Sequence, residues 1–250
     1  MNRMVFQVDT KDLAKLAILG IVGIAVTNFS YYFTVKESTV ATAILIQYTA
    51  PVLVMVYSVA VSREEQFSGA KMLSLLLALV GCYLAVSGGI AAQVRLSPVA
   101  LLSGIVSSVS FAYLLIASKH ILKKYTTWTM LVYAFGFAGV FWLIVNPPWR
   151  ILEQNYSASE WGSLWLFAIV SILIPHSMFT ASLKMLEAST ASIASTLEPI
   201  VAIVIAYFAL GESLTAAQVV GAAIVVSAIL LLQLRSASFV CALKPKGHEN

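Results

Sequence analysis

The sequence predicts an all-α membrane protein, a polytopic bundle of eight transmembrane helices arranged as an inverted-topology repeat. Three observations predict it: the composition, the length of the apolar segments, and a similarity between the two halves of the chain. Of the 250 residues, 60% are hydrophobic and 10% are charged, against about 25% charged in ordinary soluble domains. A soluble globule of this size cannot bury that much apolar surface. The composition therefore excludes a soluble enzyme.

The apolar residues fall into eight segments of roughly 20 residues each, long enough to cross a hydrocarbon core about 30 Å thick as helices. These runs are continuous rather than alternating, which argues against a transmembrane β-barrel. The predicted helices cover residues 13–35, 39–61, 69–90, 98–120, 127–146, 161–183, 188–210 and 214–235.

Residues that start and stop helices lie at the breaks between these segments. Ser97 precedes Pro98, which places a capping residue before a first-turn proline. Residues 157–160 and 215–218 both match a capping box. Residues 146–148, Asn-Pro-Pro, cannot continue a helix and are expected to open the longest loop.

Basic residues indicate which connections face the cytoplasm. Eight crossings place both termini on one side, and cytoplasmic termini put 12 basic residues inside against 3 outside, as the positive-inside rule requires. We therefore expect a multi-pass protein of the inner or plasma membrane with both termini cytoplasmic. The cluster at 119–124 is interpreted as an interface anchor, with a specific lipid or regulatory site as the alternative. The inside set is Arg3, Lys11, Lys15, Arg63, Lys71, Lys119, Lys123, Lys124, Lys184, Arg235, Lys244 and Lys246, and the outside set is Lys36, Arg95 and Arg150.

The chain is similar to itself at an offset of 148 residues. This offset pairs Lys36 with Lys184 and Pro51 with Pro199, and the starts of the predicted helices agree as well. Lys36 falls in an outer connection and Lys184 in an inner one, so the two copies cross the membrane in opposite senses. Inverted-topology repeats of this kind are typical of many secondary transporters.

The two copies have unequal lengths. Residues 95–236 form a complete second repeat of five helices, residues 1–94 form an incomplete first repeat of three, and residues 237–250 form a cytoplasmic tail. By the same offset, roughly 50 residues that would hold two more helices are expected to be missing from the first repeat. A truncated gene product, an internal start and a genuinely shortened relative are three open explanations.

Three stretches of the second copy carry a resemblance to a known family. They are TLEPI at 196–200, LGESLT at 210–215 and VGA at 220–222, with looser counterparts in the first copy. These motifs resemble EamA-type proteins of the drug/metabolite transporter superfamily, over a region from about residue 13 to residue 235.

The resemblance implies a ten-helix carrier that exports or exchanges small metabolites or drugs. This chain departs from that pattern in having eight predicted helices, and in having Leu73 where the first copy would usually have a glycine. The residues that match structural motifs of the family are Pro51, Pro199, Glu64, Glu212 and Gly221.

Polar side chains inside the predicted spans are the candidate substrate site. Glu198 lies about ten residues, or roughly 15 Å, from the cytoplasmic start of its helix, where an unpaired carboxylate costs a few kcal/mol on insertion scales. Pro199 follows it and frees the carbonyl of Ser195 to bind water or substrate. His176 lies at a similar depth on the neighbouring helix, so it is expected to form an inner polar pair with Glu198.

A second polar pair is predicted near the outer face, where Asn28 and Gln47 each lie about 12 Å from the helix end. We interpret both pairs as the lining of a central pathway. Glu198 is then the group that binds substrate or takes up and releases a proton. The alternative is a neutral Glu198 that holds neighbouring helices together. The aromatic side chains expected beside the outer pair are Tyr31, Tyr32 and Tyr48.

The leading interpretation is therefore a gradient-driven carrier of small molecules, with a cationic or zwitterionic substrate suggested by Glu198. The sequence contains no hydrolase, metalloprotease or phosphate-loop motif. Neither an enzyme, a cofactor, a metal site nor a disulfide is expected. Membrane lipids and a small-molecule substrate are the expected partners, a homodimer is a further candidate, and nucleic acid is not expected.

Two other classes of function stay open. One is a non-transporting truncated paralogue or a membrane subunit that needs a partner, and apolar segments encoded upstream of Met1 would speak against it. The other is an intramembrane enzyme, which requires a second reactive group within hydrogen-bond reach of Glu198 or His176.

Overall fold

The computed structural model describes residues 7–89, 94–211 and 213–242, with side chains as far as Leu234. Within these ranges all regular structure is helical. Eight helical spans in them are long and apolar enough to cross a membrane, which confirms the predicted all-α, polytopic class. The spans are Thr10–Glu37, Val40–Val61, Gly69–Ser87, Pro98–Ile121, Thr127–Val145, Ala158–Ser182, Ala188–Leu210 and Ala216–Leu234.

Four of the spans change helix type along their length. The first, second, sixth and seventh spans each contain a π-helical segment, and the seventh also contains a short 3₁₀ turn. In chain order the elements are α1 (Thr10–Ile18), η2 (Leu19–Val26), α2 (Thr27–Glu37), α3 (Val40–Gln47), α4 (Ala50–Val56), η3 (Tyr57–Val61), α5 (Gly69–Ser87), α6 (Pro98–Ile121), α7 (Thr127–Val145), α8 (Pro148–Leu152), α9 (Ala158–Phe167), η5 (Ala168–Leu173), α10 (Ile174–Ser182), α11 (Ala188–Ala194), η6 (Ser195–Leu197), α12 (Glu198–Ile205), η7 (Ala206–Leu210) and α13 (Ala216–Ala242).

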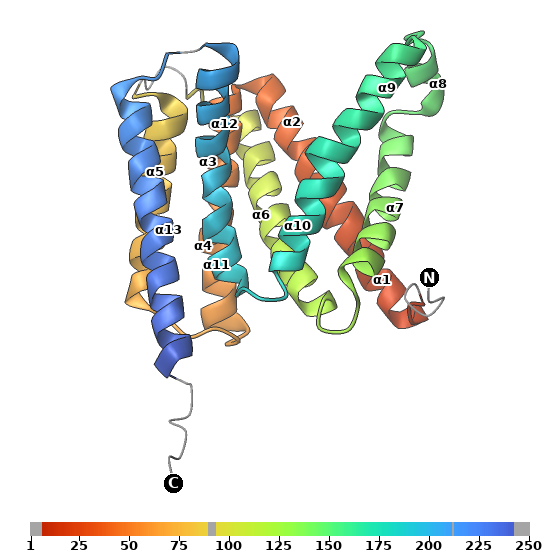
Figure 1. Cartoon of the computed structure of the whole chain (residues 1–250). Coiled ribbons are helices and arrows are strands. Elements are labelled where there is room, and N and C mark those ends of the chain that lie inside the picture. The colour runs from red at the N-terminus through yellow and green to blue at the C-terminus, as the bar shows by residue number, and fades with distance from the viewer. Residues whose placement is uncertain (1–6, 90–93, 212, 243–250) are drawn as a thin grey trace.

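The spans run up and down the bundle alternately, so that α1 starts and α13 ends at the same end (Figure 1). The connections 62–68, 122–126 and 183–187 also lie at this end. We call it the basic end, because these connections contain Arg63, Lys123, Lys124 and Lys184. The connection after α2 lies at the opposite end, whereas the connection after α10 lies at the basic end (Figure 1). Helices paired by the offset of 148 residues therefore run in opposite directions.

Helix caps form where the sequence predicts them. Ser97 accepts a hydrogen bond from the N–H of residue 100 at 3.0 Å. Ser157 and Glu160 form a capping box at the start of α9. Thr215 and Gln218 do the same before α13, each backbone N–H donating to the other side chain at 2.9 and 3.2 Å. These contacts satisfy N–H groups that the first helical turn leaves without an internal partner.

The loop expected after Asn146 contains one helical turn, α8. Pro148 is its first residue. A proline ends the preceding helix but suits the first position of the next one, because that position needs no N–H donor. From the sequence, residues 146–148 indicated only the end of the preceding helix.

The second and seventh spans are broken at matching positions. α3 ends at Gln47 and α4 begins at Ala50, while the 3₁₀ turn Ser195–Leu197 separates α11 from α12. Each break precedes a proline, Pro51 or Pro199, which lacks the N–H that would continue the hydrogen-bond ladder. The two prolines are 148 residues apart.

The π-helical segments also recur near this offset. η2 (Leu19–Val26) corresponds to η5 (Ala168–Leu173), and η3 (Tyr57–Val61) corresponds to η7 (Ala206–Leu210). The irregular backbone of one half thus reappears in the other half, although the two sequences share few identities.

Helices α5 and α13 pack side by side (Figure 1), and they cross closely at two glycines. A Cβ atom added to Gly221 would lie 2.5 Å from the backbone N of Ala85 and 2.6 Å from the carbonyl O of Gly81. Only glycine lets the two backbones approach this far. The motif residue Gly221 therefore sets the distance between the two helices.

The corresponding first and sixth spans are buried to very different degrees. The most apolar window of Thr10–Glu37 is 44% buried, against 6% for the window of Ala158–Ser182. α6 and α7 cover the first span, whereas the sixth span packs mainly on α7 through α10.

Candidate functional site

Two broken helices meet at the centre of the bundle through one tyrosine. The hydroxyl of Tyr48, which follows α3, lies 3.1 Å from Oε2 of Glu198 and 3.2 Å from the carbonyl O of Ser195. Tyr48 is 6% exposed. A single hydroxyl proton serves one acceptor at a time, so Tyr48 donates either to the carboxylate or to the carbonyl.

The backbone break supplies one of these acceptors. Pro199 has no N–H, so the carbonyl of Ser195 lacks the partner that a continuous helix would provide. The sequence predicts that this carbonyl is free to bind water or substrate. In the structure this carbonyl instead accepts the backbone N–H of Glu198 within the 3₁₀ turn, and the Tyr48 hydroxyl lies 3.2 Å from it as a second contact. The Ser195 hydroxyl bonds within its own turn, to the carbonyl of Ser192 at 2.7 Å.

Glu198 is the first residue of α12, and its carboxylate lies at an accessible position. Glu198 is exposed, whereas the next two residues, Pro199 and Ile200, are buried. The start of a helix carries a partial positive charge, which favours an acidic side chain there. The structure thus combines an exposed acid, a tyrosine hydroxyl and a carbonyl of the 3₁₀ turn, a set able to bind a proton or a polar solute.

His176 does not join this group directly. Its ring packs against Phe135 on α7, with ring centroids 5.6 Å apart. In the ranges that the structure describes, no hydrogen bond or ion pair links His176 to Glu198. The reason is that α10 packs on α7, whereas α12 packs on α5. The two residues have a similar depth in the membrane, but their helices contact different neighbours.

The predicted outer set is divided as well. Asn28 on α2 and Gln47 on α3 are half-buried, and no hydrogen bond between them is present in the described part of the chain. The rings of Tyr31 and Tyr32 pack edge to face, with their centroids 5.7 Å apart, and Tyr32 is 62% exposed. Tyr48, expected beside the outer pair, instead contacts Glu198 of the inner pair.

Hydroxyl contacts beside the broken helix were not predicted. Thr49 Oγ1 lies 2.8 Å from Ser108 Oγ on α6, and Thr34 Oγ1 on α2 lies 2.7 Å from Ser103 Oγ. These two serines of α6 thus pair with threonines of neighbouring helices. The signal for Thr49 was its position between Tyr48 and the proline of the break.

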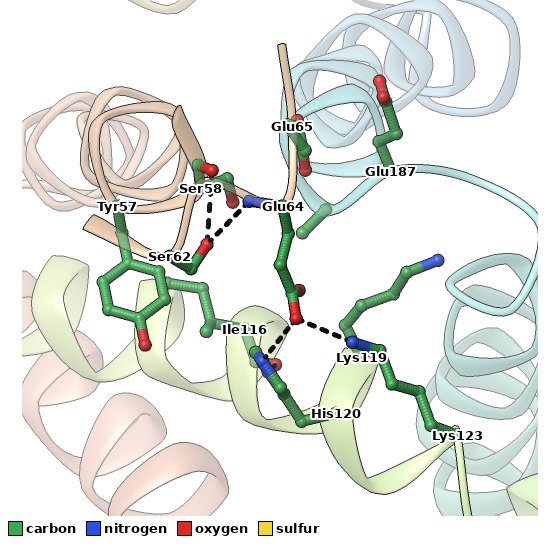
Figure 2. Close-up of a pocket in the computed structure, with 11 residues that line it drawn as sticks. Tyr57, Ser58, Ser62, Glu64, Glu65, Ile116, Lys119, His120, Lys123 and Glu187 are labelled. Carbon is green, nitrogen blue, oxygen red and sulfur yellow. Dashed lines mark hydrogen bonds and ion pairs between the residues drawn. The ribbon is translucent and has the colours of Figure 1, made fainter. Parts of the chain in front are cut away.

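A cavity of about 310 Å³ lies at the basic end, between η3, the connection 62–68, α6 and the start of α11 (Figure 2). Oε1 of Glu64 accepts a hydrogen bond from Nζ of Lys123 at 2.7 Å and lies 3.3 Å from Nε2 of His120. The hydrogen bond from Lys123, with the nearby His120, holds the pKa of Glu64 below its ordinary value. Glu64 therefore connects the first copy to α6.

Glu65 has a structural role that no sequence pattern predicted. It accepts hydrogen bonds from the backbone N–H of Ser189, at 3.1 Å, and from the Ser189 hydroxyl. Lys71 forms ion pairs with Glu65, at 3.3 Å, and with Glu187. Glu65 thus caps the start of α11 from a distant part of the chain.

The motif residue Glu212 lies outside the described residues, so its predicted role stays a prediction. No group of three or more His, Cys, Asp or Glu side chains that could hold a metal occurs among the residues the structure describes.

The chain is similar to known membrane proteins. An uncharacterized transporter of Archaeoglobus fulgidus is 30% identical over 224 residues, covering 84% of this chain and 75% of the relative. The uncharacterized inner membrane transporter YicL of Salmonella typhimurium is 24% identical over 232 residues, covering 91% of this chain and 75% of the relative.

A solved crystal structure shares the fold. It superposes with a TM-score of 0.76 at 18% identity, covering 97% of this chain and 80% of the other. Residues 3–87 and 98–234 both match one family of transporters. These two segments span most of the chain and include both broken helices. The chain therefore belongs to the EamA-like transporter family.

Proposed function

We propose that the chain is a gradient-driven carrier of small metabolites or drugs that works by alternating access around Glu198. The observation that carries this proposal is the contact of Tyr48 with Glu198 and Ser195 where two oppositely directed, broken helices meet. Discontinuous helices in inverted repeats form the substrate and ion sites of many secondary transporters.

The proposed mechanism is a rocking of residues 1–94, an incomplete first repeat, against residues 95–236, a complete second repeat. Ionised Glu198 accepts the Tyr48 hydroxyl and ties α3 to α12. Protonation or substrate binding at the carboxylate releases the hydroxyl, which then donates to the Ser195 carbonyl alone. This change of partner biases which side of the bundle opens. Asn28, Gln47, Tyr31 and His176 line the pathway on either side of this contact.

The acid at the centre favours a cationic or zwitterionic substrate, because a carboxylate in the membrane needs a compensating charge or a proton. We further propose that the basic end faces the cytoplasm, which places both termini on the cytoplasmic side of the inner or plasma membrane. The excess of basic residues at that end supports this orientation.

The test is uptake into liposomes that contain the purified chain. A panel of cationic, zwitterionic and anionic metabolites is offered with and without a pH gradient, and liposomes without protein are the control. We expect accumulation of at least one cation or zwitterion, and a rate that changes with the gradient. Absence of uptake across the whole panel would contradict the proposal.

A second candidate is a membrane subunit that needs a partner for activity. It is favoured by the low burial of the sixth span. The most apolar window of Ala158–Ser182 is 6% buried, against 44% for the window of the corresponding first span. The partner would supply two helices equivalent to α6 and α7. A photo-crosslinker at Trp165, on the exposed face of α9 (67% exposed), tests this in native membranes. The matched control is the equally exposed Leu102 of α6.

The second candidate predicts a discrete crosslinked polypeptide at position 165 but not at position 102, together with uptake only when that polypeptide is reconstituted as well. Uptake by the chain alone speaks for the carrier and against the subunit.

A further inference from the structure

The contact of Glu64 with α6 has an unusual hydrogen-bond arrangement around His120. Nδ1 of His120 lies 2.8 Å from the carbonyl O of Ile116. A carbonyl only accepts hydrogen bonds, so Nδ1 carries a hydrogen. The other ring nitrogen, Nε2, faces Oε1 of Glu64 at 3.3 Å (Figure 2).

This geometry has opposite consequences for the two charge states of the ring. A neutral imidazole with its hydrogen on Nδ1 turns the Nε2 lone pair toward the carboxylate, and the two repel each other. An imidazolium carries a hydrogen on both nitrogens and completes an ion pair with Glu64. Both contacts of the ring are therefore favourable at the same time only when His120 is protonated, a change that imidazoles undergo between about pH 5 and pH 8.

The contact joins parts of the chain that are distant in sequence. Glu64 follows the broken second span, and His120 and Lys123 end α6. Both partners are about two-fifths exposed, with side-chain exposures of 40% for Glu64 and 42% for His120, so protons from the aqueous phase reach them.

The charged and titratable groups around His120 leave Glu64 as its partner. Lys71 pairs with the two other acids of the cavity, and Lys119 donates to the carbonyls of residues 183 and 186 at 2.7 Å each. The groups facing the cavity are Tyr57 from η3, Glu64 and Glu65 from the connection 62–68, Lys119 and Lys123 from α6, and Glu187 before α11.

We propose that Glu64 and His120 form a proton-binding latch that holds the basic end closed when the pH on that side falls. Protonation of His120 adds an ion pair between the connection 62–68 and α6, and deprotonation removes it. Lys123 keeps Glu64 ionised over the same pH range, because the hydrogen bond from Lys123 holds the pKa of Glu64 low. The effect on transport, a slower cycle at acidic pH on the basic side, rests on the proposed carrier function, whereas the latch itself does not.

Electron–electron distance measurements on the protein in nanodiscs test the latch. Spin labels are placed at Phe67 in the connection and at Trp128 on α7, which are 65% and 54% exposed, in a background with Cys82→Ala and Cys241→Ala. We expect the ratio of the short-distance to the long-distance population to rise about two- to fivefold from pH 7.5 to pH 5.5, the range for one exposed ion pair.

Variants separate the latch from other titrations. His120→Gln and Glu64→Gln are each expected to abolish the pH dependence, and His120→Arg is expected to keep the short-distance population high at every pH. A wild-type distribution that is the same at both pH values, or a pH dependence that survives in His120→Gln, overturns the proposal. A distance shift without any uptake in liposomes would leave the latch standing and the carrier function refuted. Uptake without a distance shift would support the carrier function and overturn the latch.

Discussion

The hydroxyl of Tyr48 links the two broken helices at the residue scale. It has one proton and two acceptors, the Glu198 carboxylate at 3.1 Å and the Ser195 carbonyl at 3.2 Å. A charged acceptor forms the stronger hydrogen bond, so ionisation of Glu198 draws the proton toward the acid. In the proposed mechanism, the charge of Glu198 therefore determines whether Tyr48 donates to the carboxylate or to the Ser195 carbonyl.

Tyr48→Phe is expected to destabilise the protein modestly. It removes the only hydrogen on the ring that can bond these acceptors, and hydrogen bonds between membrane helices contribute about 0.6–1.7 kcal/mol. Thermal unfolding in detergent should show Tm lowered by about 1–7 °C. Tyr83→Phe on α5, at a ring that is 43% exposed, is the matched control and should leave Tm unchanged. Equal Tm for the wild type and Tyr48→Phe would show that the contact contributes nothing.

Glu198→Gln is expected to reduce uptake and to remove its dependence on a pH gradient. The amide cannot ionise, and the loss of a charged hydrogen-bond partner of about 1.5–3 kcal/mol corresponds to a rate loss of roughly ten- to hundredfold. Initial rates in liposomes measure both effects. Glu153→Gln in the exposed segment after α8 is the control. Unchanged rate and unchanged pH dependence in Glu198→Gln would exclude this residue from the pathway.

The pairing of Tyr48 with Glu198 was not predictable from residue depth. Counting helical rise placed the outer pair about 12 Å from one face and Glu198 about 15 Å from the other. In a core about 30 Å thick this leaves only about 3 Å of depth between Glu198 and the outer pair, a difference that a tyrosine side chain spans. Depth located both residues near the midplane, but it did not indicate which helices are neighbours.

At the scale of the helix, prolines and glycines determine the geometry more than hydrophobicity does. Pro51 and Pro199 mark the two breaks, and the sequence predicted a freed carbonyl at the second of them. Gly221 marks the close crossing of α5 and α13. The π-helical segments had no such signal, because their sequences are as apolar and as continuous as the α-helical ones beside them.

Gly221→Ala is expected to be destabilising. The added Cβ would lie 2.5 Å from a backbone nitrogen of α5, so the helices must separate. Overpacking of this kind costs about 1–3 kcal/mol, which lowers Tm by about 2–12 °C. Gly136→Ala on α7, where an added Cβ meets nothing within 4 Å, is the control. Its Tm should stay the same or rise, since alanine favours helix over glycine. Similar Tm changes in both variants would show that the crossing is not tight.

Across the whole molecule, the sequence predicts the number, bounds and direction of the spans well. The reason is that span length and capping are local properties of the chain. The contacts of Glu64 with His120 and of Glu65 with Ser189 join residues 56 and 124 positions apart, so only the tertiary structure reveals them and the cavity beside them. The unequal burial of the first and sixth spans is likewise a property of the assembled bundle.

Alternating access around the broken helices is the central claim, and the labelling of one cysteine tests it most directly. Ser195→Cys is introduced into the background with Cys82→Ala and Cys241→Ala, in vesicles of known orientation. A membrane-impermeant thiol reagent is then applied from each side in turn. Cysteines at Met185, at the basic end, and at Leu152, at the opposite end, report the sidedness; these positions are 89% and 67% exposed. The account predicts that position 195 reacts from both sides, and that each control reacts from one side only. A cysteine at position 195 that reacts from one side only, or from neither, would contradict it.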